Sequence, residues 1–365
     1  MASPPAHMTL PSPSEPDRPS TATVSAIVVA FNSDPARLTR CLSALDKSVG
    51  VEVSIILVDN GSSRPLQGSA SAALAHTVLR SAHNGGFAAG VNLGLRHAVG
   101  SHVAVVNDDA VVAPDMLARC VAAIDAAGPM CVAAAPKVLF SGTDEPIIDS
   151  CGLALRSSGE AFSAGIGQPD LGQFDQDPTV LGPCMSAAVF RSEAFATVGL
   201  LDERYFLYYE DVDWALRALL AGHTTVFVPA AIATHEHAAT TRLLGEGRRY
   251  RLVQRNLLVC ATINLSARAA ARVWAGRLVV HAKGIVTGPY RRERLSALGG
   301  ALARLPSALG TRRHRRRLAV IADEVAFAFA DGLEPFIEVE GYRPTASGEA
   351  HGAALVRLGR AIPPR

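Results

Sequence analysis

Three runs of apolar residues, spaced through the first third of the chain, constrain its fold most. They read VSAIVVAF at 24–31, VSIILVDN at 53–60 and HVAVVNDD at 102–109. Each run has the length of a strand and lacks polar alternation, which is typical of strands covered on both faces. Segments with helical character follow the first run, at 35–47, and the last, from Pro114. This alternation predicts an α/β fold with a Rossmann-like, mostly parallel sheet.

Polar side chains gather where the apolar runs end. The second run ends in Asp59 and Asn60, and the third in Asn107, Asp108 and Asp109. Ligands of open α/β sheets bind at the carboxyl ends of the strands. Carboxylate and amide oxygens suit Mg²⁺ or Mn²⁺, which could hold a diphosphate there. Asn and Asp are also common in strand-to-helix turns, so the residues alone leave both interpretations open.

Acidic and aromatic side chains are interleaved in DERYFLYYEDVDWALRA, residues 202–218. Carboxylates among aromatic rings are costly unless they are solvated, paired or used in chemistry. Glu210 and Asp211 stand where a helix begins, so Asp211 could be an ordinary N-cap. Asp213 and Arg217 are four residues apart, which predicts an ion pair on the helix surface.

The basic residues are unevenly distributed. The 365-residue chain has a net charge of only +2, yet residues 266–317 carry thirteen Lys or Arg and a single acid, Glu293. RRHRRR at 312–317 is a compact cationic cluster. A basic helical segment can lie on an anionic membrane surface, bind nucleic acid, or form a solvated face, and the membrane is the interpretation we favour over nucleic acid.

The remaining composition concerns the cellular compartment. Six cysteines are scattered without a CxxC pair, which indicates reduced core thiols in the cytosol. The N-terminus is rich in Pro and Ser, without the apolar segment of a signal peptide, and no run of 18 apolar residues predicts a membrane-spanning helix. We expect a disordered tail at 1–22, a catalytic domain at 23–262, a basic helical appendage at 263–330 and a C-terminal tail at 331–365.

Seven landmarks occur in order between Val24 and Asn256, about two thirds of the chain. They are VSAIVVAFNS, ILVDNGSS, NGGFAAGVNLGL, VVNDDA, VGLLDERYFLYYEDVDWALRALLAG, VPAAIATHEH and YRLVQRN. Together they resemble the family 2 inverting glycosyltransferases with the GT-A fold, particularly the bacterial rhamnosyltransferase-like group. NGGFAAGVNLG is not the GxGxxG of a dinucleotide-binding fold, so a nicotinamide dehydrogenase is disfavoured.

The resemblance implies a role for individual residues. Asn107-Asp108-Asp109 occupies the D-x-D position of the family, although the first residue is Asn instead of Asp. Asp109 matches the carboxylate expected to touch the metal, and His235 the histidine near the metal and diphosphate, whereas His237 has no match. Glu210 and Asp211 match the acidic pair that supplies the catalytic base. Asp59 would contact the nucleotide base, and the residues expected to bind the donor are Asp59, Asn60, Asn84, Asn107 and Asp108.

The resemblance thus implies an inverting, Mg²⁺- or Mn²⁺-dependent glycosyltransferase. The expected donor is dTDP-L-rhamnose, followed by a UDP-sugar, and the expected acceptor is a hydroxyl of a cell-envelope glycan or of a polyprenyl-linked sugar. We expect a cytoplasmic protein on the inner face of the membrane. A nucleotidyltransferase is one alternative, but AFNSDPARL lacks the glycines it would need. A catalytically silent sugar-nucleotide-binding or scaffold protein is the other, and the intact Asp109, Asp211 and His235 argue against it.

Overall fold

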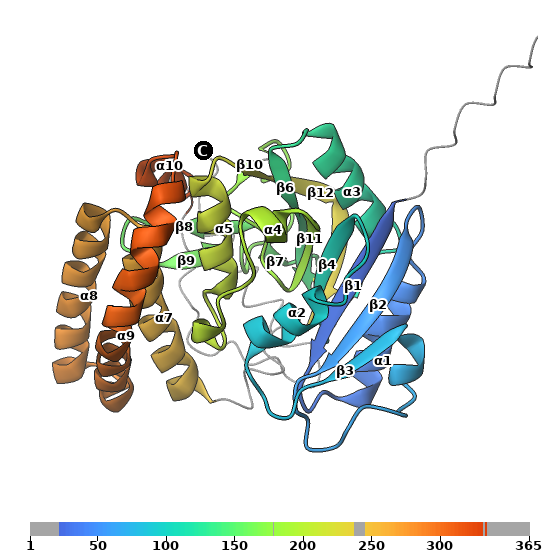
Figure 1. Ribbon diagram of the computed structural model, residues 1–365, viewed down its shortest axis with the longest axis horizontal. Coiled ribbons are helices and arrows are strands. Elements are labelled where there is room, and N and C mark those ends of the chain that lie inside the picture. Colours follow the sequence, from blue (N-terminus) through green and yellow to red (C-terminus); the bar gives the residue numbers. More distant parts are fainter. Residues whose placement is uncertain (1–21, 178, 237–244, 331–332, 334–365) are drawn as a thin grey trace, which may run out of the picture.

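The computed structural model describes residues 22–177, 179–236, 245–330 and 333. The tails expected at 1–22 and 331–365 fall outside the described residues apart from Ala22 and Leu333, and so does His237. Figure 1 shows a sheet flanked by helices, with a group of C-terminal helices at the end away from β1 and β2. All six cysteines lie in the described part as free thiols, in agreement with the sequence.

The first part of the chain forms the parallel half of the sheet. Its elements are β1 (Thr23–Ala30), α1 (Pro35–Asp46), β2 (Glu52–Asp59), η1 (Ala72–Leu74), β3 (Thr77–Arg80), α2 (Phe87–Leu95) and β4 (His102–Asn107). Strand β1 lies between β2 and β4, and β3 follows at the edge, with every pairing parallel. The prediction of alternating buried strands and helices is therefore confirmed.

The next part completes the sheet. Its elements are β5 (Ala110–Val112), α3 (Met116–Ala126), β6 (Cys131–Phe140), β7 (Ile148–Ser150), β8 (Leu153–Leu155), β9 (Ala161–Ser163), β10 (Thr179–Val180), β11 (Ala187–Arg191), α4 (Ala194–Thr197), η2 (Glu203–Tyr205), α5 (Glu210–Leu220) and β12 (Thr224–His235). The strand order is β10-β12-β6-β11-β4-β1-β2-β3. Strand β11 runs antiparallel to both of its neighbours, β4 and β6, while β6 and β12 are parallel. The sheet is thus mostly parallel, with β11 reversed near its centre and the short strands β5, β7 and β10 paired antiparallel with β12 or β6.

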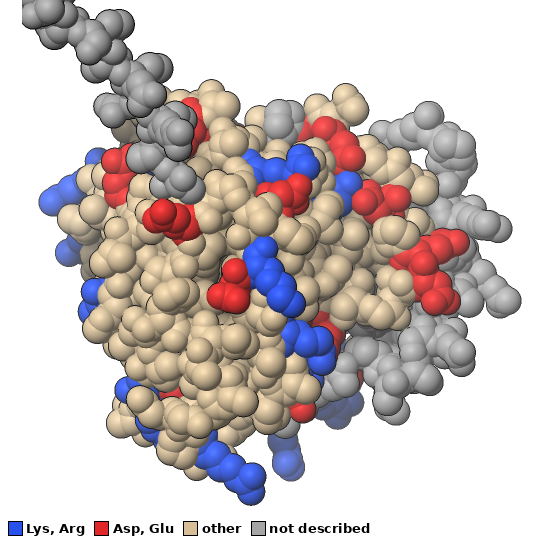
Figure 2. Space-filling view, turned by 90° about the vertical axis from the view of Figure 1, so that its right-hand side faces the viewer, with Lys and Arg blue, Asp and Glu red and all other residues tan. Residues whose placement is uncertain are grey.

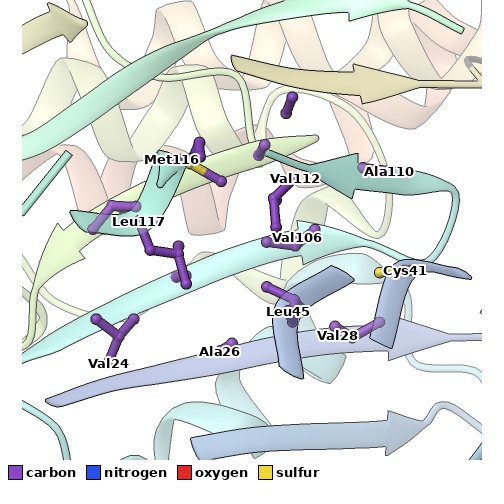
Figure 3. Close-up of a cluster of buried hydrophobic side chains, with 14 of the residues drawn as sticks. Val24, Ala26, Val28, Cys41, Leu45, Val106, Ala110, Val112, Met116 and Leu117 are labelled. Atoms are coloured by element: carbon purple, nitrogen blue, oxygen red, sulfur yellow. The ribbon is translucent and has the colours of Figure 1, made fainter. Parts of the chain in front are cut away.

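Both faces of the sheet are covered. Alternate residues of β1 point to opposite sides, so Ala26 and Val28 pack under α1 and α3 while Ile27 packs under α2. Figure 3 shows the first side, where Leu45 of α1 and Met116 of α3 approach β1 and β4. Burial on both faces explains why these strands read as continuous apolar runs.

The C-terminal helices are α7 (Glu246–Asn264), α8 (Ala267–Thr287), α9 (Arg291–Leu318) and α10 (Asp323–Ala328). They share a hydrophobic core with α5, to which buried alanines such as Ala270 and Ala301 contribute. The boundary that we expect between 262 and 263 falls inside α7. These helices pack against one another and against the segment around α5, as Figure 1 shows.

Three arginines of the cationic cluster at 312–317 are turned toward neighbouring elements, whereas Arg313, His314 and Arg317 are exposed. Arg315 pairs with Asp202 and with Asp213. Arg316 pairs with Asp323 at 2.7 Å. Arg312 donates to the carbonyl oxygen of Thr262 at 2.8 Å, near the end of α7. These guanidinium groups join α9 to its neighbours.

The predicted pair of Asp213 and Arg217 is also confirmed, with 3.0 Å between Arg217 Nε and Asp213 Oδ2. Its expected surface location is wrong, because Asp213 is completely buried. Trp214 and Tyr205 are buried as well, in agreement with a packing role for the aromatic residues of this segment.

Charge is mixed on the side of the molecule where α1 and β2 lie. Figure 2 shows Lys and Arg side chains interspersed with Asp and Glu there, without a large patch of one sign. Within the described residues, we find no helix with both the length and the apolar character that crossing a membrane requires.

Helix α2 approaches β1 unusually closely, because two of its residues are glycines. A Cβ at Gly94 would lie 2.6 Å from Ile27 Cγ2. We predict that Gly94→Ala lowers the free energy of unfolding by about 1–3 kcal/mol, since Ile27 is fixed in the core. Gly276 of α8 is the matched control, since a Cβ there meets nothing within 4 Å. Gly276→Ala should leave stability unchanged or raise it by up to about 1 kcal/mol. Urea denaturation measures both, and equal effects would contradict the close packing.

Candidate active site

A cavity of about 750 Å³ opens at the edge of the sheet where β1, β2 and β4 end. Its lining comes from the strand ends, the hairpin β8–β9, the start of α5 and the start of α7. The polar lining residues include Asn60, Asn84, Asn107, Asp108, Asp109, Asp149, Ser163, Ser186, Glu210, Asp211, His235, Arg248 and Arg249. The structure therefore brings together eight of the nine residues that the sequence assigned to the site.

His235, the last residue of β12, is held between two carboxylates. Its Nε2 lies 3.0 Å from Asp109 Oδ1 and its Nδ1 lies 2.7 Å from Asp149 Oδ2. All three residues are buried. Burial alone would lower the pKa of His235, but the hydrogen bonds to Asp109 and Asp149 outweigh it and raise the pKa to about 10. Burial likewise raises the pKa of Asp109, but the hydrogen bond from His235 brings it below its usual value.

The arrangement of Asp109, Asp149 and His235 suits a divalent cation whose ligands come mainly from the phosphate groups of a substrate. Within the described ranges, His, Cys, Asp and Glu side chains form no metal-binding group of three or more. Mg²⁺ and Mn²⁺ need few protein ligands where phosphates complete the coordination. Asp109 would offer an oxygen, and His235 Nε2 would offer a nitrogen once the cation displaces the proton that the raised pKa keeps on it. Asp149 binds the opposite nitrogen of the imidazole, as carboxylates commonly do behind a metal-ligating histidine. Asp149 orients His235 and leaves Nε2 facing Asp109.

Asp108 lies beside this group. It is buried and accepts a hydrogen bond from Ser33 Oγ. Burial, and secondly the negative charge of Asp109, raise the pKa of Asp108 to about 6. Ser33 follows β1 and was not singled out by the sequence, although it belongs to the first landmark.

Asn60 and Asn84 form the end of the cavity beyond β2. Asn60 Nδ2 donates to the carbonyl oxygen of Gly86 at 2.9 Å and to Asn84 Oδ1 at 3.2 Å. These bonds join the end of β2 to the start of α2. Asn107, also in the lining, lies with its Nδ2 3.4 Å from His235 Nε2.

Asp59 is the one assigned residue that does not line the cavity. It is fully buried, and Ser62 N donates to its Oδ1 at 2.9 Å while Leu66 N donates to its Oδ2 at 3.1 Å. Arg80 forms an ion pair with the same Oδ2. Burial would raise the pKa of Asp59, but these hydrogen bonds hold it below the usual value. In this structure Asp59 shapes the turn after β2.

Glu210 and Asp211 occupy the first turn of α5 and both line the cavity. The N-cap of the helix is Tyr209, so the alternative that Asp211 is the cap is set aside. Burial raises the pKa of both carboxyl groups, and that of Glu210 rises further because the charge of Asp211 adds to it. Glu210 Oε2 is buried and has no hydrogen-bond partner among the described residues. A carboxylate in such surroundings binds a proton more readily than one in water.

The loop before α5 has an unusual backbone. Phe206, Tyr208 and Tyr209 all have positive φ, at 67°, 69° and 74°, although none is glycine. Such conformations cost on the order of 1–3 kcal/mol each and persist only where neighbouring groups impose them. Tyr209 is anchored through its hydroxyl, which donates to Gly159 O at 3.0 Å. The loop thus reaches from the start of α5 to the β8–β9 hairpin.

The far wall of the cavity was not anticipated from the sequence. It consists of Leu153 and Phe162 from the hairpin, and of Arg248, Arg249 and Val253 from α7. The Gly, Pro and Asp content of residues 140–182 suggests hairpins and a loop, but no local signal distinguished Asp149 or placed this hairpin at the cavity. Arg248 and Arg249 are two residues among many arginines, and only the fold brings them to the cavity.

Replacing the carboxylate behind His235 tests the metal site. We predict that Asp149→Asn weakens Mn²⁺ binding about 10–100-fold, because the imidazole loses the partner that orients it. Isothermal titration with Mn²⁺ in the presence of a nucleoside diphosphate gives the affinity. Asp115→Asn, an exposed aspartate before α3, is the control and should bind as the wild type does. Equal Mn²⁺ affinity in the two variants would show that Asp149 does not support metal binding.

Comparisons with known proteins concern the family and the fold of this chain. Residues 25–199 match the sequence profile described as glycosyl transferase family 2. Two curated proteins, from two strains of Mycobacterium tuberculosis, are 46% identical over 56 residues and are both named N-acetylglucosaminyl-diphospho-decaprenol L-rhamnosyltransferase. The aligned segment covers 15% of this chain and 18% of the length of those relatives.

Solved structures are similar over more of the chain. TarS 1-349 from S. aureus covers 84% of this chain and 89% of its own, with 16% identity and a TM-score of 0.50. The mannosyltransferase PcManGT from Pyrobaculum calidifontis, in complex with GDP-Man and Mn²⁺, covers 84% of this chain and 86% of its own, with 17% identity and a TM-score of 0.48. The likeness to TarS concerns the fold alone, which is the GT-A fold expected from the sequence. Residues 25–199 thus form a glycosyltransferase domain that matches glycosyl transferase family 2.

Proposed function

We propose that this protein transfers a sugar, with inversion, from a nucleoside diphosphate donor to an acceptor hydroxyl. The observation that carries the proposal is that two sets of carboxylates, with different partners, line the same cavity. Asp109 and Asp149 are paired with His235, whereas Glu210 and Asp211 have no cationic partner among the described residues. The first group suits the diphosphate side of the reaction, and the second suits proton transfer.

Asp211 is the catalytic base in this proposal. Inversion requires the acceptor hydroxyl to attack the anomeric carbon from the side opposite the diphosphate, and one carboxylate accepts its proton. The raised pKa of Asp211 brings it closer to neutral pH, where a general base is most effective. Glu210 is buried beside it, and because the charge of Asp211 raises the pKa of Glu210 further, Glu210 takes up a proton first and leaves Asp211 as the ionised member of the pair.

Asp109 and His235 are the residues that would hold a divalent cation, with Asp149 orienting the histidine. Mg²⁺ or Mn²⁺ would supply charge neutralisation for the departing nucleoside diphosphate. Asn60, Asn84 and the Asn107-Asp108 pair are positioned to bind the rest of the donor. We retain Asp59 as a candidate for the nucleotide base, which requires it to exchange one of its present partners for the ligand.

The proposed donor is dTDP-L-rhamnose, with a UDP-sugar as the second candidate. The support is the name of the curated relatives together with the ordered landmarks of the sequence, although the aligned segment is short. The proposed acceptor is a cell-envelope glycan or a polyprenyl-linked sugar. The apolar residues Leu153, Phe162 and Val253 of the far wall suit the face of a sugar ring or the start of a lipid chain.

We predict that Asp211→Asn lowers kcat by about 10²–10⁴-fold while the donor affinity stays within about 2-fold, because only proton acceptance is removed. Release of nucleoside diphosphate from each donor in a panel, with and without EDTA, measures turnover. Asp115→Asn is the matched control and should leave kcat unchanged, since it changes an exposed aspartate away from the cavity.

A second readout of the same experiment is the pH profile of kcat. Turnover should fall as the pH drops, because a protonated Asp211 cannot accept a proton, and the midpoint should lie well above 3.8, the ordinary pKa of an aspartic acid. Wild-type turnover in Asp211→Asn would leave the carboxylate a structural role. Donor binding without any turnover across the panel would favour a silent sugar-nucleotide-binding protein.

We further propose that the protein acts on the cytoplasmic face of a membrane and touches it with the outer surface of α8. Leu278, Val279 and Val286 are exposed there. Arg268, Arg272 and Lys283 are exposed on the same helix, which contains no acidic residue. Exposed apolar side chains among cations suit an anionic lipid surface. We propose this face of α8 as the membrane contact in place of the cluster at 312–317, because Arg312, Arg315 and Arg316 of that cluster make internal contacts.

Flotation with liposomes tests the membrane proposal. We predict that the full chain binds vesicles increasingly as their anionic lipid content rises, and that added salt weakens binding. Changing Arg268, Arg272 and Lys283 to Glu should abolish it. The same change at Lys47, Arg64 and Arg96, three exposed cations elsewhere, is the matched control and should have little effect. Equal binding by both triple variants, or none by the wild type at low salt, would refute the proposal.

A further inference from the structure

The strained loop at 206–209 is held from the side of α7 by one buried side chain, Asn256. Its Nδ2 donates to three backbone carbonyl oxygens in and before the loop, those of Tyr205 at 3.0 Å, Leu207 at 2.9 Å and Tyr208 at 2.7 Å. Asn256 itself is 1% exposed. One carboxamide thus satisfies most of the backbone acceptors that the loop turns toward α7.

The orientation of this carboxamide is fixed by its neighbour on the helix. Arg255 Nε donates to Asn256 Oδ1 at 2.8 Å, and Arg255 Nη2 donates to Tyr205 O at 2.8 Å. The guanidinium therefore binds the oxygen of the amide, and the nitrogen must face the loop. A carboxylate at 256 would place negative charge against three carbonyl oxygens, and an alanine would leave them without a donor.

The opposite side of the loop is fixed by the start of α2. Phe87 N donates to Phe206 O at 2.7 Å. Gly86 has a φ of 90°, and a Cβ on it would lie 2.2 Å from the same oxygen. Phe206 itself has φ 67° and ψ −57°, the rare form of the γ-turn. The loop is therefore clamped between α2 and α7, and Glu210 and Asp211 follow it directly.

We infer that Asn256 is a positioning residue, whose carboxamide sets the loop at 206–209 and thereby the place of Asp211 in the cavity. The inference rests on the proposed function of Asp211 as the base. Among the described residues, the hydrogen bonds of Asn256 go to the loop and to Arg255 and none to Asn60, Asn107 or Asp109, so its direct effect falls on the end of the cavity that holds Asp211. Loss of the carboxamide should therefore slow turnover and leave donor binding intact.

The central test compares Asn256→Ala with Asn264→Ala. Both asparagines are 1% exposed and lie on α7, but the side chain of Asn264 bonds to Asp213 and to Cys260, not to the loop. We expect Asn256→Ala to lower kcat by about 10²-fold, the loss typical of a catalytic group displaced by about 1 Å, with donor affinity within about 2-fold. Asn264→Ala should keep kcat within about 3-fold of the wild-type value, even if it lowers the melting temperature as much as Asn256→Ala does. Equal losses of kcat in both variants, or no loss in Asn256→Ala, would overturn the inference.

Hydrogen–deuterium exchange provides a readout that does not require turnover. Exchange of the peptide covering 206–212 should rise in Asn256→Ala and stay at the wild-type level in Asn264→Ala. Should the wild type show no transfer with any donor, the proposed function fails, while exchange still decides whether Asn256 holds the loop. Should Asn256→Ala not fold, Arg255→Met supplies the same comparison, because it removes the group that orients the carboxamide. Unchanged exchange and unchanged kcat in Arg255→Met would then count against the clamp.

Discussion

A single buried carboxylate, Asp213, joins the catalytic helix to the rest of the molecule. It lies on α5 and accepts from Tyr205 Oη at 3.0 Å, Asn264 Nδ2 at 2.8 Å and Arg217 Nε at 3.0 Å, and it pairs with Arg315 of α9. Burial would raise the pKa of Asp213, but Arg217 and Arg315 outweigh it and keep the group ionised. A buried charge without such partners costs several kcal/mol, so loss of both arginines would destabilise the packing of α5 against α7 and α9. Four partners share this role, so the position of α5 does not depend on any single one of them.

The cavity contains carboxylates in two electrostatic states. Next to His235, a carboxylate is kept charged by its partner, and the pKa of Asp109 is lowered. At the start of α5, Asp211 and Glu210 lack a cation and their pKa values are raised. Opposite shifts within one cavity separate groups suited to binding a cation from groups suited to moving a proton. The family alone does not give this division, which follows from burial and from the partners of each side chain.

The sequence predicted the sheet, and it predicted that the assigned residues converge, as eight of the nine do at one cavity. Both predictions rest on local signals. Strands buried on two faces must be continuously apolar, and polar residues at their ends converge on one edge. Asp149 and the β8–β9 hairpin left no such signal, since the link between Asp149 and His235 spans 86 residues and exists only in the fold. The same reason explains the error over Arg315, which reads as part of a cationic cluster but meets Asp213 across 102 residues. Charge counted along a chain does not tell which side chains find a buried partner.

The reversed direction of β11 affects how this protein can change over evolutionary time. Strands β6 and β11 are antiparallel neighbours, and such a pair can be joined by a turn of two residues. Here residues 141–186 stand in place of that turn, and Asp149, Phe162 and Met185 of the cavity lining all belong to them. The closure entropy of a loop grows only slowly with its length, so insertions or deletions in this segment cost the sheet little. Such a protein can acquire a differently lined cavity by lengthening a hairpin, while the strands that carry Asn60, Asn107 and Asp109 remain in register.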